Sequence, residues 1–459
     1  MKNAWLNYTK EETKEINELG NRYKDFLSNC KTERECTERI ISEVEEKGFQ
    51  NIEEYIKQSK QILPGNKIYV NNRGKSLALF VIGQEDITKG MNILGAHIDS
   101  PRLDIKSNPL YEENEFVYLD THYYGGIKKY QWVTLPLAIH GVVVKKDGTK
   151  IKINIGEKEN DPVFGISDLL PHLAQEQMKK EATKIIEGEG LDILIGSRPK
   201  KKEDEKDQVK ENIIEILKEK YEIEEDDFIS AELEVVPAGK ARDFGLDRSM
   251  IMSYGQDDRS CAFTSYQAFL EIENPMRTIS CILVDKEEIG SVGATGMESH
   301  FYDSALAEIC ELLGKTSNTA VRRILKNSYM LSSDVNAAYD PLYSDVMDKK
   351  NASFFGKGVT FSKFTGARGK SGSNDADAEY IAKIRKVMDD NHVAFQVAEL
   401  GKVDIGGGGT IAYILANYNV SVIDCGVGVL SMHAPWEITS KSDLYEAYKC
   451  YKAFLKELI

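Results

Sequence analysis

The stretch MNILGAHIDSPRLDIK, Met91–Lys106, gives the strongest indication of the fold. Its apolar run ends abruptly in His97 and Asp99, as a buried strand does where it reaches the loop after its carboxyl end. Other apolar runs in the chain end in polar segments in the same way, and ligand sites of α/β sheets lie at the carboxyl ends of strands. The sequence therefore predicts an α/β domain with a polar site at one edge of its sheet.

Segments typical of strands alternate with segments typical of helices on both sides of this stretch. Strands are predicted at Lys67–Val70, Ser76–Ile82, Ser249–Tyr254, Thr278–Val284, Ser328–Ser332, Ala394–Val397 and Val420–Asp424. Helical sequence is predicted at Glu11–Gly48, Asp375–Met388 and Ser442–Leu458. Such alternation predicts a mixed, mostly parallel sheet with helices on both faces.

A different pattern interrupts this alternation. From Tyr111 to Gly156 the apolar residues alternate over short stretches, with a turn signal Lys-Asp-Gly at 146–148. An amphipathic helix is predicted around Leu217, and the charged run at 200–212 is interpreted as a solvated helix or loop. The 459 residues suit two domains. We predict one domain made of residues 1–106 and 243–459, interrupted by a β-rich insertion of residues 107–242.

The composition is that of a globular protein, with 41% hydrophobic and 29% charged residues. A net charge of −15 argues against nucleic acid or an anionic membrane as a partner. The sequence offers neither a signal peptide at Met1–Lys10 nor a membrane-spanning apolar run. Seven scattered cysteines without a CxxC pair favour reduced, mostly buried thiols. A cytoplasmic location is expected.

Five polar segments are candidates for chemistry: His97–Asp99, Gly255–Arg259, Asp285–Gly290, Ser332–Asn336 and Ser431–Pro435. Each alone has an ordinary interpretation, such as a helix cap or an exposed acidic turn. Together they do not, because the adjacent glutamates Glu287 and Glu288, close behind the apolar run ISCILV, call for compensating positive charge. Nitrogen and oxygen ligands without a thiolate suit zinc, with cobalt and manganese as alternatives. The order His, Asp, Glu-Glu, Asp, His indicates a hydrolase with two metal ions.

On these residues the chain resembles the aspartyl-aminopeptidase-type di-zinc metallopeptidases. The motifs that carry the resemblance are AHIDSPRL, YGQDDRSCAF, VDKEEIGSVGATG, LSSDVNAAYDP, DIGGGGTIAYILA and SMHAPWEI, and it extends over nearly the whole chain. It implies a zinc-peptidase-like catalytic domain with an inserted dimerisation domain. It also implies a homo-oligomer, built from dimers into a tetrahedral dodecamer.

The resemblance implies five ligands for two zinc ions per subunit: His97, Asp257, Glu288, Asp334 and His433. His97 and Asp334 would hold one ion, Glu288 and His433 the other, and Asp257 would bridge the two. Two further residues would act on these ligands or on water.

Asp99 would orient the His97 imidazole, as carboxylates behind metal-bound histidines do. Glu287 would be the general base that takes a proton from the attacking water and passes it to the leaving amine. These roles, like the ligand set, follow from the resemblance.

Further residues are implicated in substrate binding or in assembly. His172, in the insertion, resembles a histidine that reaches a neighbouring subunit's active site, although a surface or helix-capping role is the ordinary alternative. Gly406–Gly409 and Thr410 resemble a glycine loop beside the substrate backbone, with Gly407, Gly408 and Thr410 as candidate contacts. A phosphate loop is the alternative for these glycines, but its lysine and spacing are missing. Lys363, with Arg368 and Lys370 as further possibilities, is a candidate for meeting an acidic substrate side chain, and contact with a neighbouring loop is the alternative.

The favoured function is therefore a metal-dependent aminopeptidase that releases N-terminal residues from peptides, with Asp and Glu as candidate preferences. Related di-zinc deacylases and carboxypeptidase-like hydrolases share the ligand order, but they lack the DIGGGGT segment and the large insertion. A metal-binding scaffold without catalysis would predict a broken ligand set or a replaced base, and this sequence keeps both. Neither an HExxH helix nor a GxSxG turn occurs, which argues against single-zinc proteases and serine hydrolases.

Overall fold

A computed structural model describes residues 2–200 and 207–458. The chain divides into two compact units. The first unit consists of Met1–Asp99, Ala241–Met432 and Glu437–Ile459, and the second of Ser100–Lys240 and His433–Trp436. Part of the charged run predicted at 200–212 as a solvated helix or loop lies outside the described residues.

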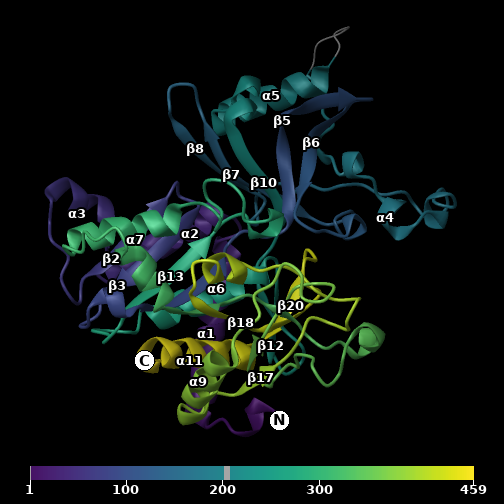
Figure 1. The fold of residues 1–459 in the computed structure, drawn as a ribbon. Coiled ribbons are helices and arrows are strands. Elements are labelled where there is room, and N and C mark those ends of the chain that lie inside the picture. Colours follow the sequence, from purple (N-terminus) through teal and green to yellow (C-terminus); the bar gives the residue numbers. More distant parts are fainter. Residues whose placement is uncertain (1, 201–206, 459) are drawn as a thin grey trace. The chain divides into compact units, whose positions relative to one another are not determined.

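The first unit is built on a nine-stranded mixed sheet (Figure 1). Its spatial order is β1 (Gln50–Asn51), β2 (Lys67–Asn72), β3 (Ser76–Val81), β13 (Thr278–Val284), β4 (Met91–His97), β14 (Tyr329–Ser332), β18 (Ser421–Gly426), β16 (Val359–Ser362) and β17 (Phe395–Val397). The four central strands β13, β4, β14 and β18 are mutually parallel, whereas β3 and β16 run antiparallel to their neighbours in this group. The predicted mixed, mostly parallel sheet is confirmed.

The central strands are almost entirely buried because both faces of the sheet are covered. Successive side chains of a strand point to opposite faces, so Leu79 joins one apolar core and Phe80 the other. One core includes residues from α1 (Lys10–Asn29), α2 (Glu33–Glu46), α6 (Gln256–Phe269), α9 (Ala378–Asp390) and α11 (Lys441–Glu457). The opposite core includes residues from α3 (Ile52–Gln58), α7 (Phe301–Leu312), α8 (Ala320–Lys326) and α10 (Ala412–Ala416).

The stretch Glu11–Gly48, predicted as helical, is two helices rather than one. α1 ends at Asn29 and α2 begins at Glu33. Thr32 caps α2, because its side chain accepts from the Glu35 backbone N–H while the Glu35 side chain accepts from the Thr32 backbone. This capping box interrupts the helical run.

A second, five-stranded sheet of the first unit corrects one prediction. Its order is β11 (Arg242–Phe244), β12 (Met250–Ser253), β20 (Glu437–Ser440), β19 (Gly428–Leu430) and β15 (Asn336–Ala337). The strand predicted at Ser249–Tyr254 is β12, and it belongs here rather than to the large parallel sheet. The reason is its pairing, because β12 lies antiparallel between β11 and β20.

The second unit confirms the inserted β-rich segment. Its six-stranded antiparallel sheet has the order β8 (Lys150–Ile155), β7 (Leu137–Val144), β10 (Ala231–Pro237), β5 (Arg102–Glu113), β6 (Phe116–Tyr124) and β9 (Ile193–Gly196). The predicted turn at 146–148 joins β7 to β8, where the Lys145 backbone N–H donates to Thr149. The predicted amphipathic helix is α5 (Gln208–Tyr221), and a short helix α4 (Ala182–Ile185) also belongs to this unit.

All seven cysteines are buried and none forms a disulfide, as predicted. Cys425 on β18 and Cys450 on α11 have their sulfur atoms 3.9 Å apart. Among the helices of the described residues, none is long and apolar enough to cross a membrane.

Candidate active site

His97 is the last residue of β4, and its imidazole is buried. The ring nitrogen Nδ1 lies 3.0 Å from the Asp99 backbone oxygen and 3.3 Å from its Oδ1. The opposite nitrogen Nε2 lies 3.2 Å from Asp257 Oδ1 and 3.8 Å from Glu287 Oε2. Burial lowers the pKa of His97, but the contacts with Asp257 and Asp99 outweigh it and raise the pKa overall. The arrangement fits the predicted pairing of an orienting Asp99 with a metal-binding nitrogen.

Asp257 comes from an irregular start of α6. Gly255 precedes the helix at φ +69°, a conformation that glycine adopts readily. Asp257 and Asp258 have non-helical torsions although they lie within the first turn. The Asp258 carboxylate accepts from the His97 backbone N–H, at 3.3 Å. These contacts join the start of α6 to the end of β4.

Glu287 and Glu288 follow β13 in a short 3₁₀ turn, Glu287–Ile289. Asp99 holds this turn, because its two carboxylate oxygens accept from the backbone N–H groups of Glu287 and Glu288, each at 3.2 Å. Asp99 therefore contacts both the His97 imidazole and the predicted base segment. A single buried carboxylate thus fixes two parts of the candidate site.

The structure groups these side chains closely enough to share a metal ion. One potential ligand atom each from His97, Asp257 and Asp334 lie within 4.8 Å of one another, and so do atoms from His97, Glu287 and Glu288. The pKa of Asp334 is raised well above its ordinary value by burial and by the nearby Asp258 carboxylate. So much buried or partly buried negative charge, with one imidazole and no thiolate in these groups, suits a divalent cation such as zinc.

His433 and His172 both belong to the second unit. The His433 Nδ1–H donates to the Gly126 carbonyl oxygen at 2.8 Å. His172 is exposed, in an irregular stretch between β8 and α4. Their roles as a zinc ligand and as a residue of a neighbouring subunit's site stay predictions.

The predicted glycine loop belongs to the first unit and needs glycine for steric reasons. Gly407 has φ +132°, and a Cβ there would lie 2.5 Å from the Ala367 Cα. The Gly408 N–H donates to Thr365 at 3.0 Å. Gly406 of this loop, together with Arg368 and Lys370, borders a cavity of about 200 Å³. Lys363, half exposed, lies 3.7 Å from Asp375, which also receives a hydrogen bond from Lys370 at 2.9 Å.

Thr410 contacts Asp424, an acidic residue that the sequence analysis missed. Its hydroxyl donates to Asp424 at 2.7 Å, and burial raises the pKa of Asp424 to about 7. Asp258 and Asp285 stand in two of the candidate segments but were given no role there; burial raises the pKa of Asp285 to about 6, with Glu33 and Asp99 adding to it. Asp285 carries the same signal as His97, because it comes just after the end of an apolar strand, whereas Asp424 lies within β18, two residues before its end.

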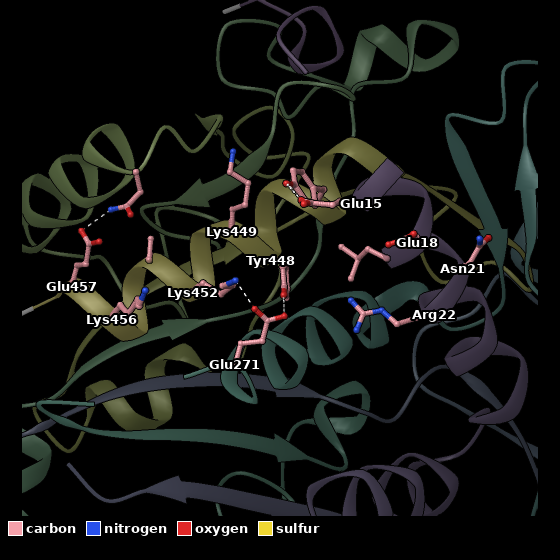
Figure 2. A pocket seen from close by; sticks show the side chains of 14 residues that line it. Glu15, Glu18, Asn21, Arg22, Glu271, Tyr448, Lys449, Lys452, Lys456 and Glu457 are labelled. Carbon is pink, nitrogen blue, oxygen red and sulfur yellow. Dashed lines mark hydrogen bonds and ion pairs between the residues drawn. The ribbon is translucent and has the colours of Figure 1, made fainter. Parts of the chain in front are cut away.

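A larger groove lies away from all these residues. It measures about 780 Å³ and is bordered by α1, α11 and the end of α6 (Figure 2). Several of its charged side chains already have partners: Lys452 donates to Glu271, and Asn391 donates to Glu457. None of the predicted site residues borders it.

Comparison with known proteins assigns the chain to a family. The model of the family described as "Aminopeptidase I zinc metalloprotease (M18)" matches residues 26–455. A probable M18 family aminopeptidase 1 from Clostridium acetobutylicum is 60% identical over 99% of this chain and 98% of its own. The crystal structure of an M18 aminopeptidase from Thermotoga maritima superimposes with a TM-score of 0.95 at 46% identity, covering 100% of this chain and 99% of its own. The crystal structure of aminopeptidase I from C. acetobutylicum superimposes with a TM-score of 0.93 at 58% identity, covering 99% of each chain.

The protein is therefore a metalloaminopeptidase with a mixed α/β fold and an inserted antiparallel β unit. It belongs to the M18 family of zinc aminopeptidases.

Proposed function

We propose that the chain hydrolyses the N-terminal peptide bond of short peptides at a centre of two zinc ions. His97 and Asp334 would hold one ion, Glu288 and His433 the other, and Asp257 both. The observation that carries this proposal is the grouping of His97, Asp257 and Asp334 within 4.8 Å at the edge of the large sheet. Two bound zinc ions would supply Lewis acidity, making a water more acidic and polarising the scissile carbonyl.

Glu287 is the proposed general base. Asp99 accepts a hydrogen bond from the Glu287 backbone N–H. The Glu287 Oε2 atom lies 3.8 Å from the His97 Nε2 atom. The Glu287 side chain is 16% exposed whereas that of Asp99 is fully buried, so water reaches Glu287 and not the group that positions it. Glu287 takes a proton from the attacking water and returns it to the leaving amine.

The ligand set is tested by metal content. Asp257→Asn and Asp334→Asn each remove a charge from the grouped residues, and both purified variants should retain less than the two zinc ions expected per wild-type chain. Asp375→Asn is the matched control, because Asp375 lies outside these groups and is half exposed. Wild-type zinc content in both ligand variants would contradict the proposed set.

Lys363 is proposed to read an acidic substrate side chain. It shares Asp375 with Lys370, but it is the more loosely held of the two, at 3.7 Å against 2.9 Å. A loosely held ammonium group can turn to a substrate carboxylate at little cost. Lys363→Ala should lower kcat/KM for N-terminal Asp and Glu relative to N-terminal Leu, with Lys370→Ala as the control. An unchanged preference in Lys363→Ala would exclude this role.

The second unit is proposed to form a dimer whose subunits complete each other's sites through His172. In its favour, Leu169, Leu170 and Leu173 beside His172 are 51%, 51% and 69% exposed, which is unusual unless a partner covers them. A relative from Saccharomyces cerevisiae, 20% identical to this chain, is described as a dodecamer. We propose the same assembly, built from dimers, for this protein.

A further inference from the structure

Glu437 lies at the start of α6, although it is far from that helix in the sequence. It is the first residue of β20, and its backbone pairs with Ser253 at the end of β12, two residues before the Gly255 cap of α6. The Glu437 side chain is buried. One of its oxygens, Oε2, accepts from the backbone N–H of Gln256 at 2.6 Å and of Asp257 at 3.1 Å.

The contact is reciprocal. The Gln256 side-chain amide donates to the Glu437 carbonyl oxygen at 2.6 Å and to the Ile251 carbonyl oxygen at 3.1 Å. The Tyr23 hydroxyl of α1 in turn donates to the amide oxygen of Gln256, at 3.3 Å. Strand β20 and the first residues of α6 are therefore tied by bonds in both directions.

The start of α6 needs this support from outside. The first N–H groups of a helix have no partner within it, and a residue at the N-cap usually supplies one. Gly255 has no side chain to do so. Asp257 adds a second requirement, because its torsions are non-helical and the helical hydrogen-bond ladder does not fix its backbone. Glu437 accepts from the backbone N–H groups of Gln256 and Asp257, the first two residues of the helix.

We propose that Glu437 is a positioning residue for the metal centre: by holding the Asp257 backbone, it aims the Asp257 carboxylate at the site shared with His97. This inference rests on the proposed ligand role of Asp257. Carboxylate acceptors make stronger bonds to N–H groups than neutral ones do. Residues that orient metal ligands typically change metal affinity by about 10–100-fold when replaced.

The test compares Glu437→Gln with Asp443→Asn. Asp443 is a matched control, because it is also buried and accepts from two backbone N–H groups, those of Gly356 and Gly358, each at 2.8 Å. The loop it holds carries none of the proposed ligands. Both variants should lower the thermal midpoint of unfolding, so stability alone cannot distinguish positioning from a structural role.

Metal affinity distinguishes them. The zinc affinity of each variant is measured by competition with a chromophoric chelator, and the ligand field is read from the visible spectrum after loading with Co²⁺. Glu437→Gln should bind zinc at least about tenfold more weakly and change the Co²⁺ spectrum. Asp443→Asn should keep the wild-type affinity and spectrum. Wild-type affinity in Glu437→Gln, or an equal loss in Asp443→Asn, would overturn the proposal.

Two additional variants complete the design. If Glu437→Gln does not fold, Glu437→Asp takes its place. This variant keeps the charge but moves the carboxylate back by one methylene. Wild-type zinc affinity in Glu437→Asp would equally overturn the inference. Asp257→Asn separates the two levels of the argument. An Asp257→Asn variant with unchanged zinc affinity would refute the ligand role itself, whereas a weakened Asp257→Asn beside an unchanged Glu437→Gln would refute the positioning role alone.

Discussion

At the scale of single residues, the candidate site concentrates carboxylates where an apolar sheet ends. Asp99 is the residue that joins its parts, since it contacts the His97 ring and accepts from the Glu287 and Glu288 backbones. The resemblance to the di-zinc metallopeptidases identified Asp99 as the residue that orients His97. It gave no role to Asp258 and Asp285, although both stand in candidate segments, and it missed Asp424, because an acidic residue near a strand end is common and its burial depends on what packs around it.

Replacement of the proposed base separates chemistry from metal binding. Glu287→Gln keeps the shape of the side chain but cannot take a proton at neutral pH. Turnover should fall by roughly 10²–10⁴-fold, the usual contribution of a general base. Zinc content, measured by atomic emission on the purified variant, should stay near the wild-type value. A variant that retains wild-type turnover would exclude Glu287 as the base.

At the scale of elements, the strand and helix pattern was predictable to within a few residues where the apolar periodicity is strong. The strand predicted at Thr278–Val284 coincides with β13. Pairing partners were less predictable, because β12 was expected in the large sheet and lies in the small one. The sequence of a four-residue strand does not reveal its neighbours, since its hydrogen-bond partners β11 and β20 are set by tertiary contacts.

The glycine loop offers a test of backbone conformation. In Gly407→Ala, the new Cβ meets the Ala367 backbone and the torsion φ +132° is strained, at a cost of about 1–3 kcal/mol. The loop should shift, and kcat/KM for peptides should fall about tenfold or more. At Gly409 a Cβ would have 4.0 Å to its nearest neighbour, so Gly409→Ala should change kcat/KM about twofold at most. Equal effects of the two substitutions would contradict this account of the loop.

An ion-pair group between α1, β11 and α11 predicts a pH dependence of stability. Burial raises the pKa of Asp243, but hydrogen bonds from Lys24 at 2.6 Å and an ion pair with Lys441 at 3.0 Å outweigh it and lower the pKa overall. A lowered pKa means that the stabilisation is present above the ordinary Asp pKa of about 3.9 and is lost as the pH falls through the folded-state value.

Asp243→Asn should therefore lower the free energy of unfolding by about 1–2 kcal/mol at pH 7. The difference from the wild type should shrink as the pH falls below about 4. Thermal midpoints of the two proteins, measured from pH 7 down to the acid limit of folding, check this. A difference that grows toward acid pH would show that the sign of the pKa shift is wrong.

At the scale of the whole molecule, composition and motif order together indicated the architecture. The interruption of α/β sequence by a short alternating pattern marks the insertion, and the six-stranded antiparallel sheet of the second unit corresponds to it. Assembly is different, because a subunit interface leaves no periodic signal in one chain. The proposed dimer rests on the exposed leucines beside His172.

Dimer-dependent catalysis predicts a specific behaviour of His172→Phe. If His172 enters a neighbouring subunit's site, its loss should lower kcat while light scattering after size-exclusion chromatography gives the wild-type mass. His122→Phe is the matched control, because His122 is also an exposed histidine of the second unit. Wild-type kcat in His172→Phe would return this residue to an ordinary surface role.

The most direct test of the central claim is hydrolysis of matched peptides after chelation and metal return. The protein is stripped of metal, supplied with zinc, cobalt or manganese, and offered short peptides with free N-termini beside the same peptides N-acetylated. The account predicts that metal restores release of N-terminal residues from the free peptides and leaves the acetylated ones intact. Cleavage of the acetyl group, release from the carboxyl end, or silence in a protein that has regained its metal would contradict it.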